Sequence, residues 1–155
     1  MNTKDVVLRK EGDGKLQYQK CSAEAGIAGV SRIFDMLCDD EMRHADALRC
    51  LQNGVRVELE QSPTLEGARR ILRTLSMRDR ASTSFHGDLS RYLSAMDFES
   101  TSADLCCQLA RQADSGWQKE LCLKIAAEDE VHFTLIEQIR ELLADEAGDG
   151  VLDAN

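Results

Sequence analysis

Two short motifs in this sequence combine the residue types that bind transition metals. Residues 41–44 read EMRH, with the form E-x-x-H, and residues 129–132 read DEVH, with the form D-x-x-H. On a helix, residues three positions apart share a face, so the acid and the histidine of each motif can point at one position. A mixed set of carboxylates and imidazoles suits iron. The motifs therefore predict a metal site, with iron as the expected metal.

A constant offset of 88 residues relates these motifs to each other and to two further glutamates. Glu11 lies thirty residues before Glu41, and Glu99 lies thirty residues before Asp129. The same offset takes Glu11 to Glu99, Glu41 to Asp129, and His44 to His132. The chain thus contains an internal repeat, and the repeat includes the candidate ligands.

The thirty-residue spacing has a geometric meaning if each half is an antiparallel helix hairpin. The midpoint of the first pair of acids is Gly26, and the midpoint of the second pair is Asp114, both in expected turns. Fifteen residues at a rise of 1.5 Å place each pair about 22 Å from its turn. Two such hairpins packed face to face would bring four carboxylates and two imidazoles to one level.

The hydrophobic pattern predicts the helices that such hairpins need. Apolar residues at helical spacing favour helices over residues 5–25, 30–52, from 83 or 89 to 113, and 117–144. Ser62-Pro63 is typical of a helix start, so the long crossover between the hairpins should contain a short helix. A bundle with one long crossover has the ferritin-like topology. We expect the bundle to span residues 1–147, with residues 148–155 as an acidic, disordered tail.

Composition excludes several classes of protein. The 155 residues suit one domain, and the net charge of −9 without a basic patch argues against binding to nucleic acid. The chain shows neither a run of about 20 apolar residues nor a secretion signal, so we expect a cytoplasmic protein that does not interact with membranes. None of the six cysteines forms a CxxC pair, which argues against zinc-ribbon and rubredoxin-type sites.

The sequence resembles the rubrerythrin and ferritin-like diiron-carboxylate family. GVSRIFDMLCDDEMRHADAL resembles the second helix of that family, and ELCLKIAAEDEVHFTLIEQI resembles the fourth. The glutamates in EGDGKLQY and DFESTSADLC match the lone glutamates of its first and third helices. The resemblance covers nearly the whole chain apart from the tail. It implies a centre of two iron ions, for which other divalent metals may substitute, with six ligands: Glu11 and Glu99 terminal, Glu41 and Asp129 bridging, and His44 and His132 donating nitrogen.

The chain departs from the family pattern at two points. The family has Glu where this chain has Asp129, and the shorter side chain leaves Glu128, which is four residues before His132 on the same face, as an alternative ligand. The rubredoxin module of full-length rubrerythrins is also absent from this sequence. A separate electron donor, such as a rubredoxin-like protein, would then be required.

Three functions remain open on the sequence alone. The first is a peroxidase or oxidase that reduces H2O2 or O2 at the iron pair. The second is an iron-binding or storage protein of the ferroxidase type, and the third is a bundle whose site has decayed, with Asp129 as the sign of decay. The sequence leaves the oligomeric state open, with a homodimer as one possibility because related bundles pair through helix faces. Tyr18 and Cys106 occupy equivalent places in the two halves. Packing in the core is the role predicted for Tyr18, with a hydrogen bond to a ligand or electron donation as the alternative. The six cysteines are expected to be buried, reduced thiols, and His86 receives no role.

Overall fold

The computed structural model describes residues 2–75 and 90–153. Every regular element in these ranges is a helix: α1 (Thr3–Glu24), α2 (Ala28–Gln52), α3 (Thr64–Thr74), α5 (Ser90–Gln112) and α6 (Gly116–Asp153). The all-α class predicted from the sequence is therefore confirmed. Within the described ranges, no helix carries an apolar stretch long enough to cross a membrane.

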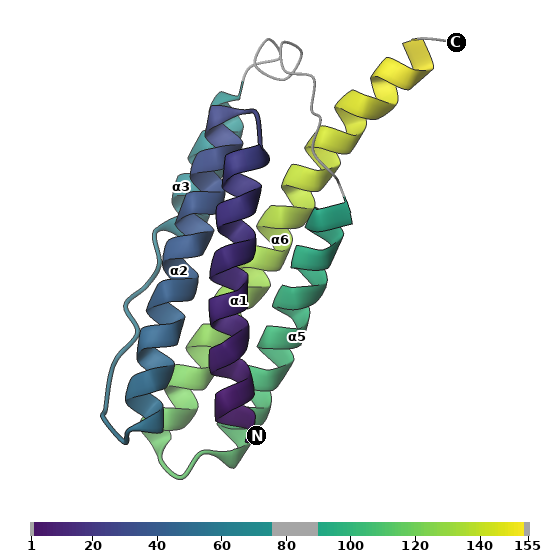
Figure 1. Ribbon diagram of the computed structural model, residues 1–155. Helices are drawn as coiled ribbons and strands as arrows, with labels where there is room; N and C mark the ends of the chain where they lie inside the picture. Colours follow the sequence, from purple (N-terminus) through teal and green to yellow (C-terminus); the bar gives the residue numbers. More distant parts are fainter. Residues whose placement is uncertain (1, 76–89, 154–155) are drawn as a thin grey trace.

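The four long helices lie side by side as two antiparallel hairpins (Figure 1). Helix α1 pairs with α2, and α5 pairs with α6, while α1 also contacts α5 and α2 contacts α6. The short helix α3 lies against α2 and α6. The turns of the two hairpins are at opposite ends of the assembly (Figure 1). Residues about half a helix length from either turn, such as those fifteen positions away, consequently meet near the middle.

The helix boundaries follow the 88-residue offset seen in the sequence. Shifted by 88, the end of α1 at Glu24 falls on Gln112, where α5 ends. The same shift takes the start of α2 at Ala28 to Gly116, where α6 begins. The repeat therefore includes the lengths and turns of the helices as well as the candidate ligands.

Most boundaries agree with the prediction to within one or two residues, and the differences have local causes. Helix α1 begins at Thr3 because Asn2 caps it, with its Oδ1 accepting a hydrogen bond from the Asp5 N–H at 2.9 Å. Helix α3 begins at Thr64, whose N–H donates to Ser62 Oγ at 3.1 Å, so Pro63 precedes the first helical residue instead of occupying it. The predicted start at Thr83 lies outside the described residues, as does His86.

The last helix is longer than the sequence predicted. Helix α6 continues to Asp153, past the expected end at Ala144 and through most of the segment 148–155, for which a disordered tail was predicted. No proline interrupts this segment. Extending an existing helix costs far less than nucleating one, so the helix continues through Gly148 and Gly150 despite their low propensity.

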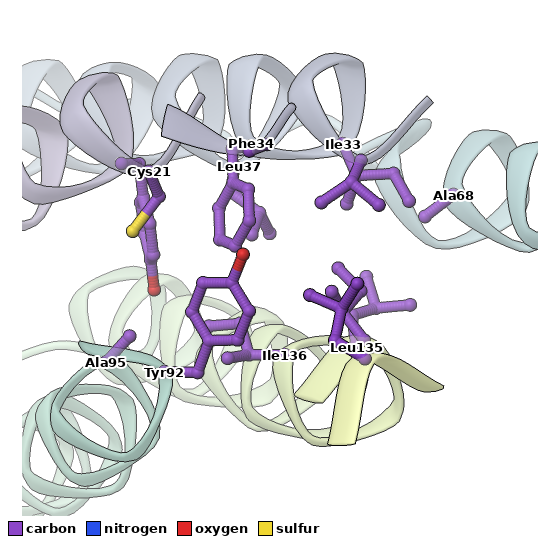
Figure 2. Close-up of a cluster of buried hydrophobic side chains, with 14 of the residues drawn as sticks. Cys21, Ile33, Phe34, Leu37, Ala68, Tyr92, Ala95, Leu135 and Ile136 are labelled. Atoms are coloured by element: carbon purple, nitrogen blue, oxygen red, sulfur yellow. The ribbon is translucent and has the colours of Figure 1, made fainter. Parts of the chain in front are cut away.

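The interior contains two apolar clusters. The Tyr18 cluster includes Tyr18, Ile33, Phe34, Tyr92 and Leu135, and the Cys106 cluster includes Val7, Leu48, Cys106, Cys122 and Ile125. In the Tyr18 cluster the rings of Phe34 and Tyr92 have centroids 5.4 Å apart, and Figure 2 shows side chains from α2, α5 and α6 converging there. The candidate ligands belong to neither cluster, so each hairpin combines apolar packing with a buried polar layer.

Two glycines of α1 provide a matched test of packing against this layer. Gly12 is exposed, and a Cβ there would meet no atom within 4 Å, whereas a Cβ on buried Gly14 would lie 2.8 Å from Phe98 Cε1. We expect Gly12→Ala to stabilise the protein by about 0.5–1 kcal/mol through helix propensity. Gly14→Ala should destabilise it by roughly 1–3 kcal/mol because Phe98 must move. Urea unfolding of both variants measures the difference, and equal stabilisation by both would contradict the close packing at Gly14.

Candidate metal centre

The structure brings the six candidate ligands together in the interior. They are contributed by all four long helices and are at most 1% exposed: Glu11 from α1, Glu41 and His44 from α2, Glu99 from α5, and Asp129 and His132 from α6. Four acids and two histidines at one level are what the spacing predicted. Burial of so many ionisable groups without a compensating partner would be costly.

The ligand atoms form two overlapping groups, each compact enough to hold one metal ion. One group contains Glu11, Glu41, His44 and Asp129, and the other contains Glu41, Glu99, Asp129 and His132. Within each group, one donor atom from each residue lies within 4.8 Å of every other. Glu41 and Asp129 belong to both groups, so their carboxylates are placed between the two positions that an ion could take.

Both histidines direct Nδ1 toward the carboxylates. His132 Nδ1 lies 3.2 Å from Glu41 Oε1 and 3.2 Å from Glu99 Oε1. His44 Nδ1 lies 3.3 Å from Glu11 Oε2 and 3.5 Å from Asp129 Oδ1. The imidazole rings are stacked, with centroids 5.9 Å apart and an interplanar angle of 14°. Each ring therefore offers one nitrogen to a different group of ligands.

The opposite nitrogen of each histidine is held by an acid from the other hairpin. His132 Nε2 donates to Asp40 Oδ2 at 2.9 Å, and His44 Nε2 is hydrogen-bonded to Glu128 Oε2. An acceptor at Nε2 keeps the proton on that nitrogen and leaves the Nδ1 lone pair free for a metal. Glu128, the alternative ligand, thus lies outside both groups, and the neighbouring Asp129 lies within both.

Arg43 connects the two outer acids at the edge of the site. Its Nη1 lies 2.9 Å from Asp40 Oδ1 and 3.6 Å from Glu128 Oε1, and its Nη2 donates to the carbonyl oxygen of Glu60. Asp40 also accepts a hydrogen bond from Ser62 Oγ at 2.7 Å. The orientation of both histidines is therefore coupled to one guanidinium and to the segment that precedes α3.

Tyr18 on α1 and Ser102 on α5 also contact the candidate ligands. The Tyr18 hydroxyl donates to Glu99 Oε1, and Ser102 Oγ donates to Glu11 Oε1 at 3.4 Å. Both residues are fully buried. Tyr18 is therefore a core residue, as its predicted role required, and it is also the hydrogen-bond donor to a candidate ligand.

Several polar atoms at the centre have no hydrogen-bond partner among the described residues. They are Glu11 Oε2, Glu41 Oε2, Glu99 Oε2, His44 Nδ1 and both carboxylate oxygens of Asp129. Buried polar atoms are nearly always satisfied in native proteins. Six of the eight buried side-chain atoms that lack a partner in the described ranges belong to candidate ligands, and the other two are Ser115 Oγ and Arg140 Nε. The chemistry of the set therefore fits one or more cations at this position.

The carboxylates at the centre do not all ionise with equal ease. Burial, and the charges of Glu99 and Glu11, raise the pKa of Glu41 and of Asp129. Burial also opposes ionisation of Glu11, but its interactions with Glu41 and His44 lower its pKa overall. Without a metal, crowding of like charges therefore favours protons on the two shared carboxylates.

The pKa values of both histidines are also raised, because the rings lie among acids. Burial disfavours the charged imidazolium of His132, but the charge of Glu99 and the hydrogen bond with Asp40 outweigh it and raise its pKa to about 10. Glu11 and Glu128 likewise raise the pKa of His44 against the effect of burial. In return, His132 is the main cause that lowers the pKa of Asp40 to about 2 despite burial. The metal-free centre therefore holds excess protons that a cation would displace.

A pocket of about 160 Å³ lies on the outer side of His132. Its wall includes Asp40, Ser62, Glu128 and His132, together with apolar side chains of α3 and α6. A small molecule can therefore approach His132 and the carboxylates of Asp40 and Glu128 through this pocket.

Sequence reasoning missed Asp40, Arg43 and Ser102. For Asp40 a signal was present, because the 88-residue offset takes it to Glu128, so an acid precedes the motif acid in both halves. The offset takes Ser102 back to Gly14, which has no side chain, and Arg43 to Val131. These two residues belong to one half only, and the repeat could not reveal them.

Comparison of the chain with models of known protein families, with curated proteins and with solved structures finds no match.

Proposed function

We propose that this chain is a ferritin-like diiron protein that reduces hydrogen peroxide or dioxygen at the buried centre. The observation that carries the proposal is the pair of overlapping ligand groups that share Glu41 and Asp129. Ferritin-like diiron proteins combine one glutamate from each of two helices with a Glu-x-x-His motif from each of the other two. Here the same arrangement is present, with aspartate in one of the motifs.

Charge balance supports two divalent ions over one. The four inner carboxylates carry four negative charges when ionised, and two divalent cations would neutralise them, whereas a single ion would leave a buried excess. Uncompensated buried charge is strongly unfavourable. Neutral histidines with Nδ1 directed inward complete the set, so that the six residues can surround two ions without residual charge.

Two ferrous ions at this position would supply two electrons together, which is the number needed to reduce peroxide to water. The residues of the chain would bind the ions, orient the ligands and exclude water. Burial of all six ligands excludes bulk water, Asp40 and Glu128 fix the histidine rings, and the Tyr18 hydroxyl holds Glu99. We infer that the oxidant arrives through the pocket beside His132.

The proposal is tested by metal analysis and peroxide stoichiometry. Protein loaded anaerobically with ferrous iron and desalted should retain about two iron ions per chain. Added peroxide should then oxidise both ions, with two electrons accepted by each peroxide molecule, and the absorbance of the ferric product follows the reaction. Retention of no iron would refute the proposed function. Retention of many ions per chain as a ferric mineral would show storage instead.

A further inference from the structure

Two buried cysteines occupy matching positions in the second hairpin. Cys106 on α5 lies eight residues before Asp114, and Cys122 on α6 lies eight residues after it. Asp114 is also the midpoint of Glu99 and Asp129. The two cysteines therefore lie at one height in the hairpin, two helical turns, or about 10 Å, from the level of the candidate ligands.

The first hairpin shows how residues at these positions meet. The 88-residue offset takes Tyr18 to Cys106 and Phe34 to Cys122. The Tyr18 and Phe34 rings are stacked, with centroids 6.0 Å apart. Cys106 and Cys122 are 0% and 1% exposed and belong to the same apolar cluster. The repeat thus replaces a facing aromatic pair in one hairpin with a thiol pair in the other.

The spacing of packed helices suits a bond between such thiols. Helix axes about 8–10 Å apart, with Cα atoms on cylinders of radius about 2.3 Å, bring directly facing Cα atoms to about 3.4–5.4 Å, and those that face less directly lie further apart. A disulfide needs Cα atoms about 4.4–6.8 Å apart. Both cysteines carry free thiols in this structure, which is the reduced form of such a pair.

Cys106 is the member of the pair whose electrostatic surroundings include candidate ligands. It follows Ser102 by one helical turn on the same helix, and Ser102 donates to Glu11. Burial, followed by the charges of Asp129 and Glu11, raises the pKa of the Cys106 thiol. The influence of these two carboxylates places Cys106 within electrostatic range of the candidate ligands.

Cys122 lies on the side that can be reached from outside. It forms part of the wall of a pocket of about 180 Å³ at the end of the bundle, together with Lys4, Leu51, Asp114 and Gln118. Burial raises the pKa of Cys122 to about 11, and the charge of Lys4 opposes that rise. A small thiol entering this pocket would meet Cys122 before Cys106.

We propose that Cys106 and Cys122 are a dithiol that supplies two electrons to the metal centre and closes into a disulfide. This inference rests on the proposed function. In the net reaction the S–H bonds of both cysteines break and an S–S bond forms, releasing two protons and two electrons. Hydrogen peroxide accepts them, its O–O bond breaks, and two water molecules form. Two molecules of a low-molecular-weight thiol then restore the pair by exchange at Cys122 and leave as their own disulfide.

The pair would double the electrons stored in one chain. Iron-loaded wild-type protein should consume about two equivalents of peroxide. One equivalent oxidises the ferrous ions, and the electrons for the other come from the thiols. Cys106→Ser and Cys122→Ser should each consume about one equivalent, a twofold loss. Cys21→Ser removes a buried thiol from the Tyr18 cluster and should behave as wild type. If both pair variants match wild type, the inference is wrong.

Mass spectrometry identifies the bond itself. After peroxide treatment, acid quenching and alkylation, we expect four of the six cysteines to be alkylated and the peptides that contain Cys106 and Cys122 to be joined. Metal-free protein treated with the same peroxide should keep six free thiols. Ferric product with six free thiols, or a single oxygen added to one cysteine without a cross-link, would overturn the thiol pair while leaving the proposed function intact.

A thiol oxidant that needs no metal tests whether the two thiols are close enough to form a disulfide, independently of any reaction at iron. Diamide added to the metal-free chain should produce the same Cys106–Cys122 disulfide. Failure of diamide and of peroxide to join these residues would show that the thiols do not face each other. A disulfide with diamide, but none with peroxide in iron-loaded protein, would show that the pair is not coupled to the centre.

Discussion

Replacing Glu41 or Asp129 with alanine is expected to remove both iron ions from the protein, whereas His44→Ala is expected to remove about one. The reason is that the first two residues belong to both ligand groups, and His44 belongs to one. Loss of a shared carboxylate also leaves the remaining buried charges unbalanced for two cations. Iron per chain, measured after desalting, reports the difference, and circular dichroism checks that each variant remains helical.

Two neighbouring acids on α6 provide matched comparisons for this experiment. Glu130 is exposed, so Glu130→Ala should retain about two ions per chain. Glu128→Ala removes the partner of His44 Nε2 and should lower metal affinity by about 10–100-fold while both ions still bind at saturation. If Glu128→Ala lost both ions and Asp129→Ala retained them, the assignment of the α6 ligand would have to be reversed.

Raising the pH from about 6 to 9 is expected to destabilise the metal-free protein strongly. His132 has a folded pKa of about 10, compared with about 6.5 in an unfolded chain. A raised pKa means that folding favours the protonated form, so this stabilisation is complete below about pH 6.5 and is lost as the pH approaches 10. Glu41 and Asp129, whose pKa values are also raised, change stability in the same direction.

The expected size of this effect is large for a chain of 155 residues. A shift of a few pKa units in one group corresponds to a few kcal/mol. Proteins of this length change their Tm by about 2–4 °C per kcal/mol, so we expect the Tm of the metal-free form to fall by roughly 10 °C. Asp40, with a pKa of about 2, contributes stability above about pH 4 that is lost only in strong acid. It therefore does not oppose the trend between pH 6 and 9.

Iron should reverse the trend because the histidines must lose their protons to bind it. At a free metal concentration of 100 times Kd, binding adds about 2.7 kcal/mol, and this contribution grows as protons cease to compete. Thermal melts at pH 6 and pH 9, with and without ferrous iron, measure both effects. In His132→Gln the pH dependence of the metal-free form should be much weaker. A metal-free protein whose Tm stayed constant or rose across this range would contradict the protonation of the buried centre.

The same groups explain why such a centre is tolerated in the fold. Both hairpins contribute apolar side chains to the Tyr18 cluster and to the Cys106 cluster, so that each hairpin is packed on both sides of the polar layer. These clusters hold the helices in register while the layer between them contains unsatisfied polar atoms. Stability is thus concentrated away from the centre, and the centre is left in the geometry that a cation would require.

The sequence by itself determined the helical class, the two hairpins and the level of the acids within each hairpin. Helix rise and the distance from the turn depend only on residue counts, so the repeat was sufficient to place Glu11 level with Glu41 and Glu99 level with Asp129, whereas the structure decided that the two pairs meet. The fold class is confirmed, and the six candidate ligands lie together in the structure. Their roles as iron ligands stay a prediction.

Only the tertiary structure decided which side chains point inward at that height. Asp129 and Glu128 both precede His132 at helical spacing, and the rotation of α6 against its neighbours places one inside the centre and the other on His44 Nε2. Asp40 reaches His132 on the opposite hairpin, a contact that depends on how α2 and α6 cross. Sequence spacing fixes height along a helix to within a residue, but rotation about the helix axis is set by the packing of all four helices together.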